Sequence, residues 1–143
     1  MEIQIRNMVP ADADVVNDLS RQLGYPDALP ETKQYIADVL GVPDHVAYVA
    51  IADEKIVGWI HGFKARHLVG KPYVEVGGLV VDKDYRNKKI GKQLLEQVKI
   101  WAADKDVVHL RVRSNTIRND AHRFYLNLGF VEIKEQKVFE VSL

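Results

Sequence analysis

Hydrophobic and polar residues follow two different periods along the chain, and the switches between them predict its elements. Ile3 and Ile5 alternate with polar neighbours, as in a short strand. Two helices are predicted next, one opened by Pro10 and stopped by Gly24, the other running from about Pro30 to Gly41. Strand-like runs then occupy 45–53, 55–65 and 71–81, and the short link between the first two predicts an antiparallel hairpin.

The second half contains the most regular helical pattern. Apolar residues share one helix face through positions 90–102: Ile90, Leu94, Leu95, Val98, Trp101 and Ala102. The strand in which Val108, Leu110 and Val112 alternate with polar residues follows this helical crossover, which predicts two parallel strands. A last helix stopped by Gly129 and a closing hairpin from Phe130, with its turn at 135–137, complete the order. We therefore predict a single α/β (α+β) domain over residues 1–143, with a mixed, mostly antiparallel sheet flanked by about four helices.

Composition narrows the function classes. The 143 residues are 47% hydrophobic and 28% charged, as in an ordinary globular domain. Twenty basic and twenty acidic side chains cancel, so no global field favours nucleic acid or a membrane surface. The absence of cysteine excludes disulfides, thiolate metal sites and a cysteine nucleophile. No signal-peptide pattern or membrane-spanning run is visible, so we expect a cytoplasmic protein, and we leave a homodimer open.

Positive charge nevertheless gathers where the strand ending at Val81 passes into the next helix: Lys83, Arg86, Lys88, Lys89 and Lys92. The segment departs from a phosphate-binding P-loop, because Arg86 stands where the first glycine should be and Gln93 replaces the hydroxyl that holds magnesium. A dinucleotide fingerprint would need three glycines, and the segment has only Gly91. The unpaired amides of a helix N-terminus do fit a diphosphate, while a solvated helix start and a nucleic-acid module remain alternatives.

The preceding strand favours a ligand. Gly77-Gly78 in a strand interior is typical of a bulge or a close backbone approach, and a bulge frees N–H groups for an extended ligand. A ligand with an amide-containing arm and a diphosphate, such as coenzyme A, has the matching shape.

These residues carry a family resemblance. LVVDKDYRNKKIGKQLL, Leu79 to Leu95, resembles the acyl-CoA motif of the GNAT superfamily of N-acyltransferases, Arg/Gln-x-x-Gly-x-Gly/Ala, with Arg86 first, Gly91 last and Lys89 in place of the first glycine. AHRFYLNLGF, from Ala121, resembles the family's C-terminal helix. The resemblance implies an acyl-CoA N-acyltransferase-like fold with a splayed sheet. It also implies direct transfer of an acetyl group from acetyl-CoA to a primary amine of a small molecule or peptide, without a metal.

The resemblance also implies site residues. Coenzyme binding is expected at Leu79, Val80, Val81, Arg86, Asn87, Lys88, Lys89, Ile90, Gly91, Lys92 and Asn119, although Asn119 can alternatively cap the last helix. Tyr125 occupies the place of the family's acid. Glu75 is the candidate base, or else a surface carboxylate or an anchor for a cationic acceptor.

The acceptor side is less defined. His61 and His67 are further candidates for proton transfer, although lone histidines on strands are more often structural. Trp59, Tyr25 and Tyr73 either line the acceptor pocket or belong to the core. No acidic cluster in the sequence demands a polycationic acceptor. A non-catalytic acyl-CoA sensor with the same binding site is the alternative function.

Overall fold

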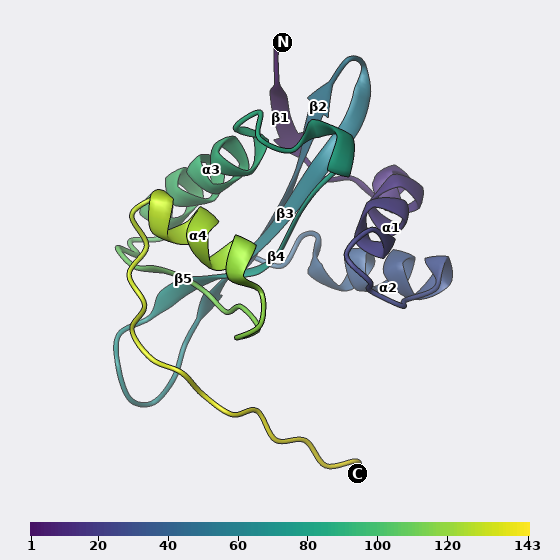
Figure 1. Ribbon diagram of the computed structural model, residues 1–143. Coiled ribbons are helices and arrows are strands. Elements are labelled where there is room, and N and C mark those ends of the chain that lie inside the picture. The colour runs from purple at the N-terminus through teal and green to yellow at the C-terminus, as the bar shows by residue number, and fades with distance from the viewer. The chain divides into compact units, whose positions relative to one another are not determined.

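The computed structural model describes residues 1–143, and Figure 1 labels its helices and strands. The strands are β1 (Gln4–Asn7), β2 (His45–Ala52), β3 (Lys55–Ala65), β4 (Tyr73–Val81) and β5 (Leu110–Val112). The helices are α1 (Ala13–Arg21), α2 (Leu29–Val39), α3 (Ile90–Asp104) and α4 (Asn119–Asn127), with 3-10 turns η1 (Pro10–Asp12) and η2 (Lys83–Tyr85). The predicted α/β fold class with four α-helices is confirmed.

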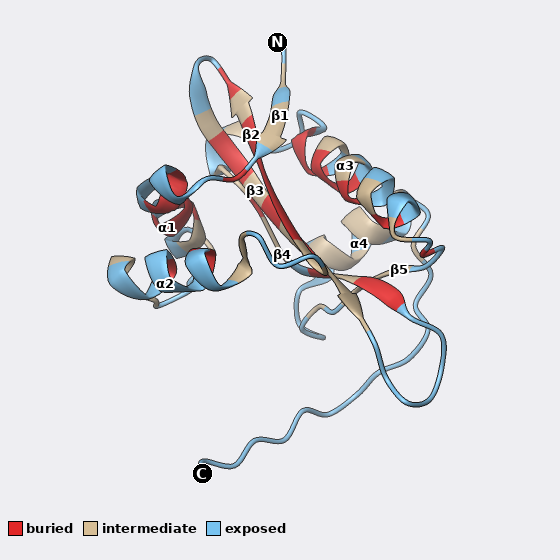
Figure 2. Ribbon diagram, turned by 180° about the vertical axis from the view of Figure 1, so that it is seen from behind, coloured by how far each residue is buried: buried red, intermediate tan, exposed pale blue.

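The five strands form one sheet in the order β1-β2-β3-β4-β5. The first three pairings are antiparallel, and β4 pairs with β5 in parallel, as the helical crossover predicts. Helices α1 and α2 cover one face of this sheet and α3 covers the other (Figures 1 and 2). The mixed, mostly antiparallel sheet is therefore confirmed.

The core lies on both faces of the central strands. Figure 2 shows buried residues along the strands and on the inner side of α3. The stripe predicted for that helix is buried at Ile90, Leu94, Leu95, Val98 and Ala102. On the other face, Ala47 and Val49 pack with residues of α1 and α2. No helix is both long enough and apolar enough to span a bilayer.

An ion pair holds the connection from β1 to η1. The Arg6 guanidinium donates to both carboxylate oxygens of the buried Asp12, at 2.8 and 2.9 Å, and the Val9 amide donates to the same carboxylate at 2.9 Å. The hydrogen bonds from Arg6 are the main reason that the pKa of Asp12 lies below its ordinary value. This pair fixes the turn that leads into α1.

The chain divides into two compact units, residues 1–113 and 114–143. The second contains α4, which Gly129 follows in a left-handed conformation at φ 91°. The predicted closing hairpin is wrong: residues 130–143 form no strand, and Val138 and Phe139 are 90% and 87% exposed. The turn at 135–137 has no Gly, Asn or Asp for a tight hairpin, and an isolated two-stranded hairpin is barely stable in water.

Candidate functional site

Strand β4 has an irregularity that separates its two halves. The pairing with β3 jumps from Gly62 opposite Val76 to His61 opposite Gly78, so Gly77 is an extra residue without a partner on β3. The parallel pairing with β5 covers only Val74–Val76 and stops there. The predicted bulge and splay are therefore present. Beyond Gly77, the edge of β4 that faces away from β3 has no strand beside it.

Close contacts explain the two adjacent glycines of the bulge. A Cβ atom on Gly77 would lie 2.5 Å from Nδ1 of His61, and a Cβ atom on Gly78 would lie 2.7 Å from the indole of Trp59. Both distances are far below a normal carbon contact. The His61 and Trp59 side chains therefore rest directly against the bulged backbone.

The unpaired edge leads into the basic segment. Leu79, Val80 and Val81 pair with β3 on one side only, and their backbone groups on the other edge can bind an extended ligand. The segment after them is tied down, because the Lys83 amide donates to Gln22 at 2.9 Å and the Tyr85 hydroxyl donates to Asp53 at 2.8 Å. These anchors hold the basic segment beside the start of α3.

The N-terminus of α3 has features of an anion site. No side chain caps it, and its first turn contains no acidic residue. The first hydrogen bond of the helix runs from the Gln93 amide to the Lys89 carbonyl at 3.1 Å, which leaves the amides of residues 90–92 without a partner inside the helix. The exposed cations around them form none of the ion pairs in the protein: Arg86, Lys88, Lys89 and Lys92.

Lys89 replaces the first glycine of the motif but keeps a backbone conformation that favours glycine. Lys89 adopts a left-handed conformation with φ 64° and ψ 17°, which glycine reaches without the clash of a Cβ atom. Asn87 is also left-handed, at φ 61°. The segment thus has the backbone turn that a glycine would allow, although a lysine side chain stands there.

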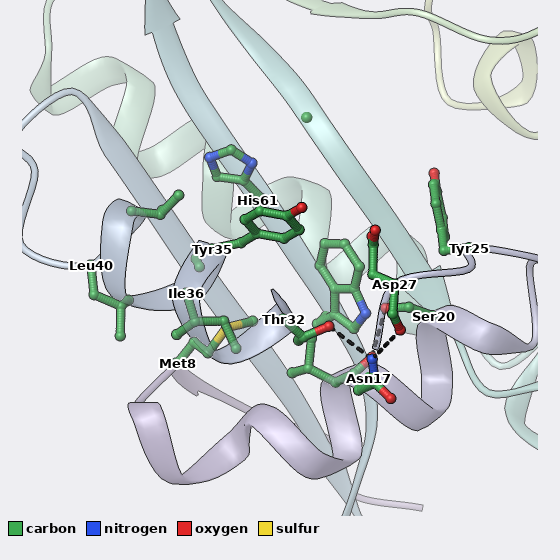
Figure 3. Close-up of a pocket in the computed structure, with 15 residues that line it drawn as sticks. Met8, Asn17, Ser20, Tyr25, Asp27, Thr32, Tyr35, Ile36, Leu40 and His61 are labelled. Carbon is green, nitrogen blue, oxygen red and sulfur yellow. Dashed lines mark hydrogen bonds between the residues drawn. The ribbon is translucent and has the colours of Figure 1, made fainter. Parts of the chain in front are cut away.

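A cavity of about 220 Å³ opens between α1, α2 and the sheet (Figure 3). Its polar and aromatic lining includes Asn17, Tyr25, Asp27, Tyr35, Trp59 and His61, and its wall ends at the bulge residue Gly77. The cavity therefore meets the sheet where β4 leaves β5. Of the aromatic residues predicted for an acceptor pocket, Tyr25 and Trp59 are present in it.

The wall of this cavity is held together by Asn17, and the carboxylate of Asp27 contributes negative charge to it. The buried Asn17 amide donates to the Asp27 carbonyl at 2.9 Å and to the Thr32 hydroxyl at 2.8 Å, which ties α1 to α2 and to the loop between them (Figure 3). The charge of Asp27, followed by that of Glu31, raises the pKa of the exposed Tyr35 phenol. Folding thus gathers carboxylates that the sequence alone did not show as a cluster.

His61 has a histidine partner on the neighbouring strand. Its Nε2 lies 2.9 Å from Nδ1 of His45, and the two rings are nearly coplanar, with an interplanar angle of 10°. Phe63 stacks on both imidazoles at centroid distances of 5.3 and 5.6 Å. Burial, and then the charge of His45, lowers the pKa of His61 to about 4. His61 is therefore neutral at neutral pH.

Glu75 lies on the other side of the bulge in an ion pair. Its carboxylate accepts from Nε of Arg113 at 2.9 Å, and its side chain is 16% exposed. A regular β4 would put Glu75 and Leu79 on one face of the sheet. Because Gly77 is an extra residue, Glu75 pairs with Phe63 and Leu79 pairs with Ile60. Phe63 and Ile60 are three positions apart on β3, so Glu75 and Leu79 face opposite sides of the sheet. Glu75 shares the face of His61 and the cavity.

Two aromatic predictions have different outcomes. Tyr73 does not line the cavity: it is 5% exposed, its hydroxyl lies 3.2 Å from Nε2 of His67, and the Arg111 guanidinium stacks 4.0 Å from its ring centroid. His67 belongs to this stack at the far end of β4 rather than to the cavity. Both are structural partners, because Tyr73 is the first residue of β4 and lies at the opposite end of the β4–β3 pairing from the bulge.

The remaining predicted residues belong to the unit 114–143. Tyr125, half-buried in α4, makes edge-to-face contacts with Phe124 and Phe130 at centroid distances of 5.2 and 5.4 Å. Asn119 is the first residue of α4, whose cap position is Arg118, so Asn119 does not cap the helix. The role of each toward a coenzyme stays a prediction.

Sequence reasoning missed Asn17, Asp27, Tyr35 and His45. They come from α1, a loop, α2 and β2, and no motif connects positions so far apart. The only local signal was a polar or aromatic side chain near apolar positions, which is common in any folded domain. No group of three side chains suited to a metal ion is present.

The profile of the acetyltransferase (GNAT) family matches residues 13–130. Streptothricin acetyltransferase of Escherichia coli is 25% identical over 115 residues, which cover 80% of this chain and 64% of that protein. The chain thus spans less than two thirds of that relative's length.

Solved structures share the fold. An aminoglycoside antibiotic 6'-N-acetyltransferase from Acinetobacter baumannii superposes with a TM-score of 0.89 at 19% identity, over 99% of each chain. An aminoglycoside N-acetyltransferase in complex with CoA superposes with a TM-score of 0.91 at 18% identity, over 99% of this chain and 96% of the other.

Proposed function

This chain belongs to the acetyltransferase (GNAT) family, and we propose that it transfers an acetyl group from acetyl-CoA to a primary amine carried by a cationic small molecule or peptide. One observation carries the proposal. A strand with an unpaired edge runs from a cavity into an uncapped, cationic helix N-terminus, so a donor site and an acceptor site meet at the Gly77 bulge.

The donor would be held by charge at one end and by backbone at the other. The amides of residues 90–92 and the helix dipole would bind the diphosphate, with Arg86 and Lys92 supplying positive charge. The amide-containing arm would lie along Leu79–Val81 and extend the sheet where β5 has ended. The strand from Val81 to Gly77 covers roughly 13 Å, so the thioester would arrive near the bulge.

The acceptor would enter through the cavity on the opposite side of the bulge. Aromatic faces at Tyr25, Tyr35 and Trp59 with the carboxylate of Asp27 suit a cationic amine. The similar proteins are named as acetyltransferases of streptothricin and of aminoglycosides, and these names support a cationic amine as the acceptor. We propose direct attack of the amine on the thioester in a ternary complex.

Two groups are proposed for proton transfer in this reaction. Tyr125 would protonate the leaving thiolate, as its place in the family's C-terminal helix implies. Glu75 is a candidate base, although its ion pair with Arg113 also suits an electrostatic anchor for the cationic acceptor. Substitution of each residue distinguishes these roles once an acceptor is known.

Binding is tested by thermal melts with acetyl-CoA, coenzyme A and ATP. Acetyl-CoA should raise the melting temperature by mass action, and Arg86→Ala or Lys92→Ala should reduce that rise. An equal rise with ATP would refute recognition of the amide-containing arm.

Catalysis is tested by release of free coenzyme A with a panel of amines: aminoglycosides, streptothricin, linear polyamines and peptide amines. Release that depends on one of these amines supports the enzyme. Tight binding of acetyl-CoA without release for any amine would favour the acyl-CoA sensor instead.

A further inference from the structure

The cavity wall at the bulge holds a titratable pair that the proposed reaction has not yet used. His61 lines the cavity on β3, and its Nδ1 lies beside Gly77 at the point where an acceptor amine would meet the thioester. His45, the first residue of β2, is half-buried and in contact with solvent. The two imidazoles therefore connect the inside of the cavity with the surface of the protein.

The geometry of the pair favours proton transfer between the rings. The nitrogens are 2.9 Å apart, the ring centroids 5.2 Å apart, and the rings 10° from parallel, so the imidazoles lie edge to edge almost in one plane. A hydrogen bond in that arrangement lies along the N–H direction. Phe63 stacks on both rings and restricts their tilt.

We propose that His61 and His45 form a proton relay that carries the proton of the attacking amine from the cavity to solvent. Resting on the proposed acetyl transfer, this makes His61 the base in place of Glu75, which keeps its alternative role as an anchor for the cationic acceptor. His45 is a positioning residue that acts through His61. In the receptive tautomer, His61 donates from Nε2 to Nδ1 of His45 and presents the lone pair of its Nδ1 at the bulge.

The relay balances one proton in against one proton out. The amine nitrogen forms a bond to the thioester carbon and becomes positively charged, while the carbonyl oxygen takes the electron pair. The amine proton passes to Nδ1 of His61, the Nε2 proton of His61 passes to Nδ1 of His45, and Nε2 of His45 releases a proton to water. The carbon–sulfur bond then breaks and the thiolate leaves with its electron pair.

The charges around His61 explain why a partner is needed. Burial beside His45 keeps His61 neutral, so a proton that stayed on it alone would be strongly disfavoured. The other charged or titratable groups near this cavity include Tyr35 of α2, Tyr25 and Asp27 of the preceding loop, and the Glu75–Arg113 ion pair opposite Phe63. Handing the second proton to His45 in the same step leaves no cation on His61.

Glutamine substitutions separate a relay from a single base. His61→Gln and His45→Gln keep a hydrogen-bonding group but cannot pass a proton, so each should lower kcat by about 10²-fold. The double variant should lose no more than either single variant, because the two residues act as one unit. Imidazole in the buffer should restore part of the activity of His61→Ala. His67→Gln is the matched control and should turn over like wild type, since His67 contacts Tyr73 away from the cavity.

Two outcomes would overturn the relay while leaving acetyl transfer intact. One is a His45→Gln variant with wild-type kcat, which would leave His61 acting alone or only packing. The other is a charged His61 imidazole at neutral pH in the nitrogen NMR spectrum of the ligand-free protein. Failure of the proposed function looks different: wild type itself would show no melt shift with acetyl-CoA and no release of coenzyme A.

Discussion

The buried His61 should make the folded protein sensitive to mild acid. Its pKa is lowered from 6.5 to about 4, first by burial and then by His45. A pKa lower in the folded than in the unfolded chain means that the unfolded chain binds the proton more readily between these values. The stabilisation from neutral His61 is therefore complete above pH 6.5 and is lost as the pH falls to about 4.

The size of the effect follows from the shift. Each pKa unit corresponds to about 1.4 kcal/mol, so the fall from 6.5 to about 4 sets an upper limit of roughly 3 kcal/mol. His61 is half-buried rather than fully enclosed, and solvent screening reduces that limit. We expect about 1–2 kcal/mol of the free energy of unfolding to depend on this imidazole.

Urea unfolding of wild type and His61→Gln at pH values from about 7 to 4.5 measures how much of the free energy of unfolding depends on the protonation of His61. The variant should be less stable at neutral pH, but the gap to wild type should narrow by about 1–2 kcal/mol at the acid end. His67→Gln should run parallel to wild type. The pKa of Asp12 is lowered from its ordinary value of 3.8, so the stabilisation from its carboxylate is lost only below about that pH and does not affect this comparison. Parallel curves for wild type and His61→Gln would refute the reasoning.

Other substitutions test the donor site, the chemistry and the fold. Gly91→Val should crowd the diphosphate site and weaken acetyl-CoA binding at least about tenfold in calorimetry, an effect that unchanged affinity in a folded variant would disprove. Tyr125→Phe should retain binding and lower kcat by about 10²–10⁴-fold in steady-state kinetics, whereas turnover within about threefold of wild type would make Tyr125 a packing residue. Asp12→Asn should cost about 1–3 kcal/mol in urea unfolding, because Arg6 keeps its charge and loses the negative charge of its partner, and an unchanged midpoint would contradict this. Leu94→Ala empties a fully buried position and should cost about 2–5 kcal/mol in the same assay, well above any surface control such as Lys99→Ala.

Local patterns in the sequence were sufficient for most of the elements. The apolar stripe from Ile90 to Ala102 became α3, and the glycines predicted to stop helices at 24, 41 and 129 adopt positive φ values. The crossover through α3 correctly predicted a parallel β4–β5 pair. These features depend on neighbours within one or two turns of the chain, so spacing alone contains the information.

Predictions that needed a distant partner failed more often. The C-terminal residues alternate like a strand, yet residues 130–143 join no sheet and remain irregular. Val108 fits the alternation of β5 but lies outside the strand and is 86% exposed. A strand exists only where another strand supplies its hydrogen bonds, and the sequence of one segment does not contain that partner.

The sequence by itself determined the donor half of the candidate site, because Leu79 to Lys92 is one continuous run of strand, turn and helix start. Only the tertiary structure decided the acceptor half. Asn17, Asp27 and Tyr35 meet His61 through the packing of α1 and α2 on the sheet, and His45 meets His61 through the β2–β3 pairing. The extra residue at Gly77 then decided which side chains of β4 share their face. Contacts between residues far apart in sequence depend on register and packing, which local spacing does not specify.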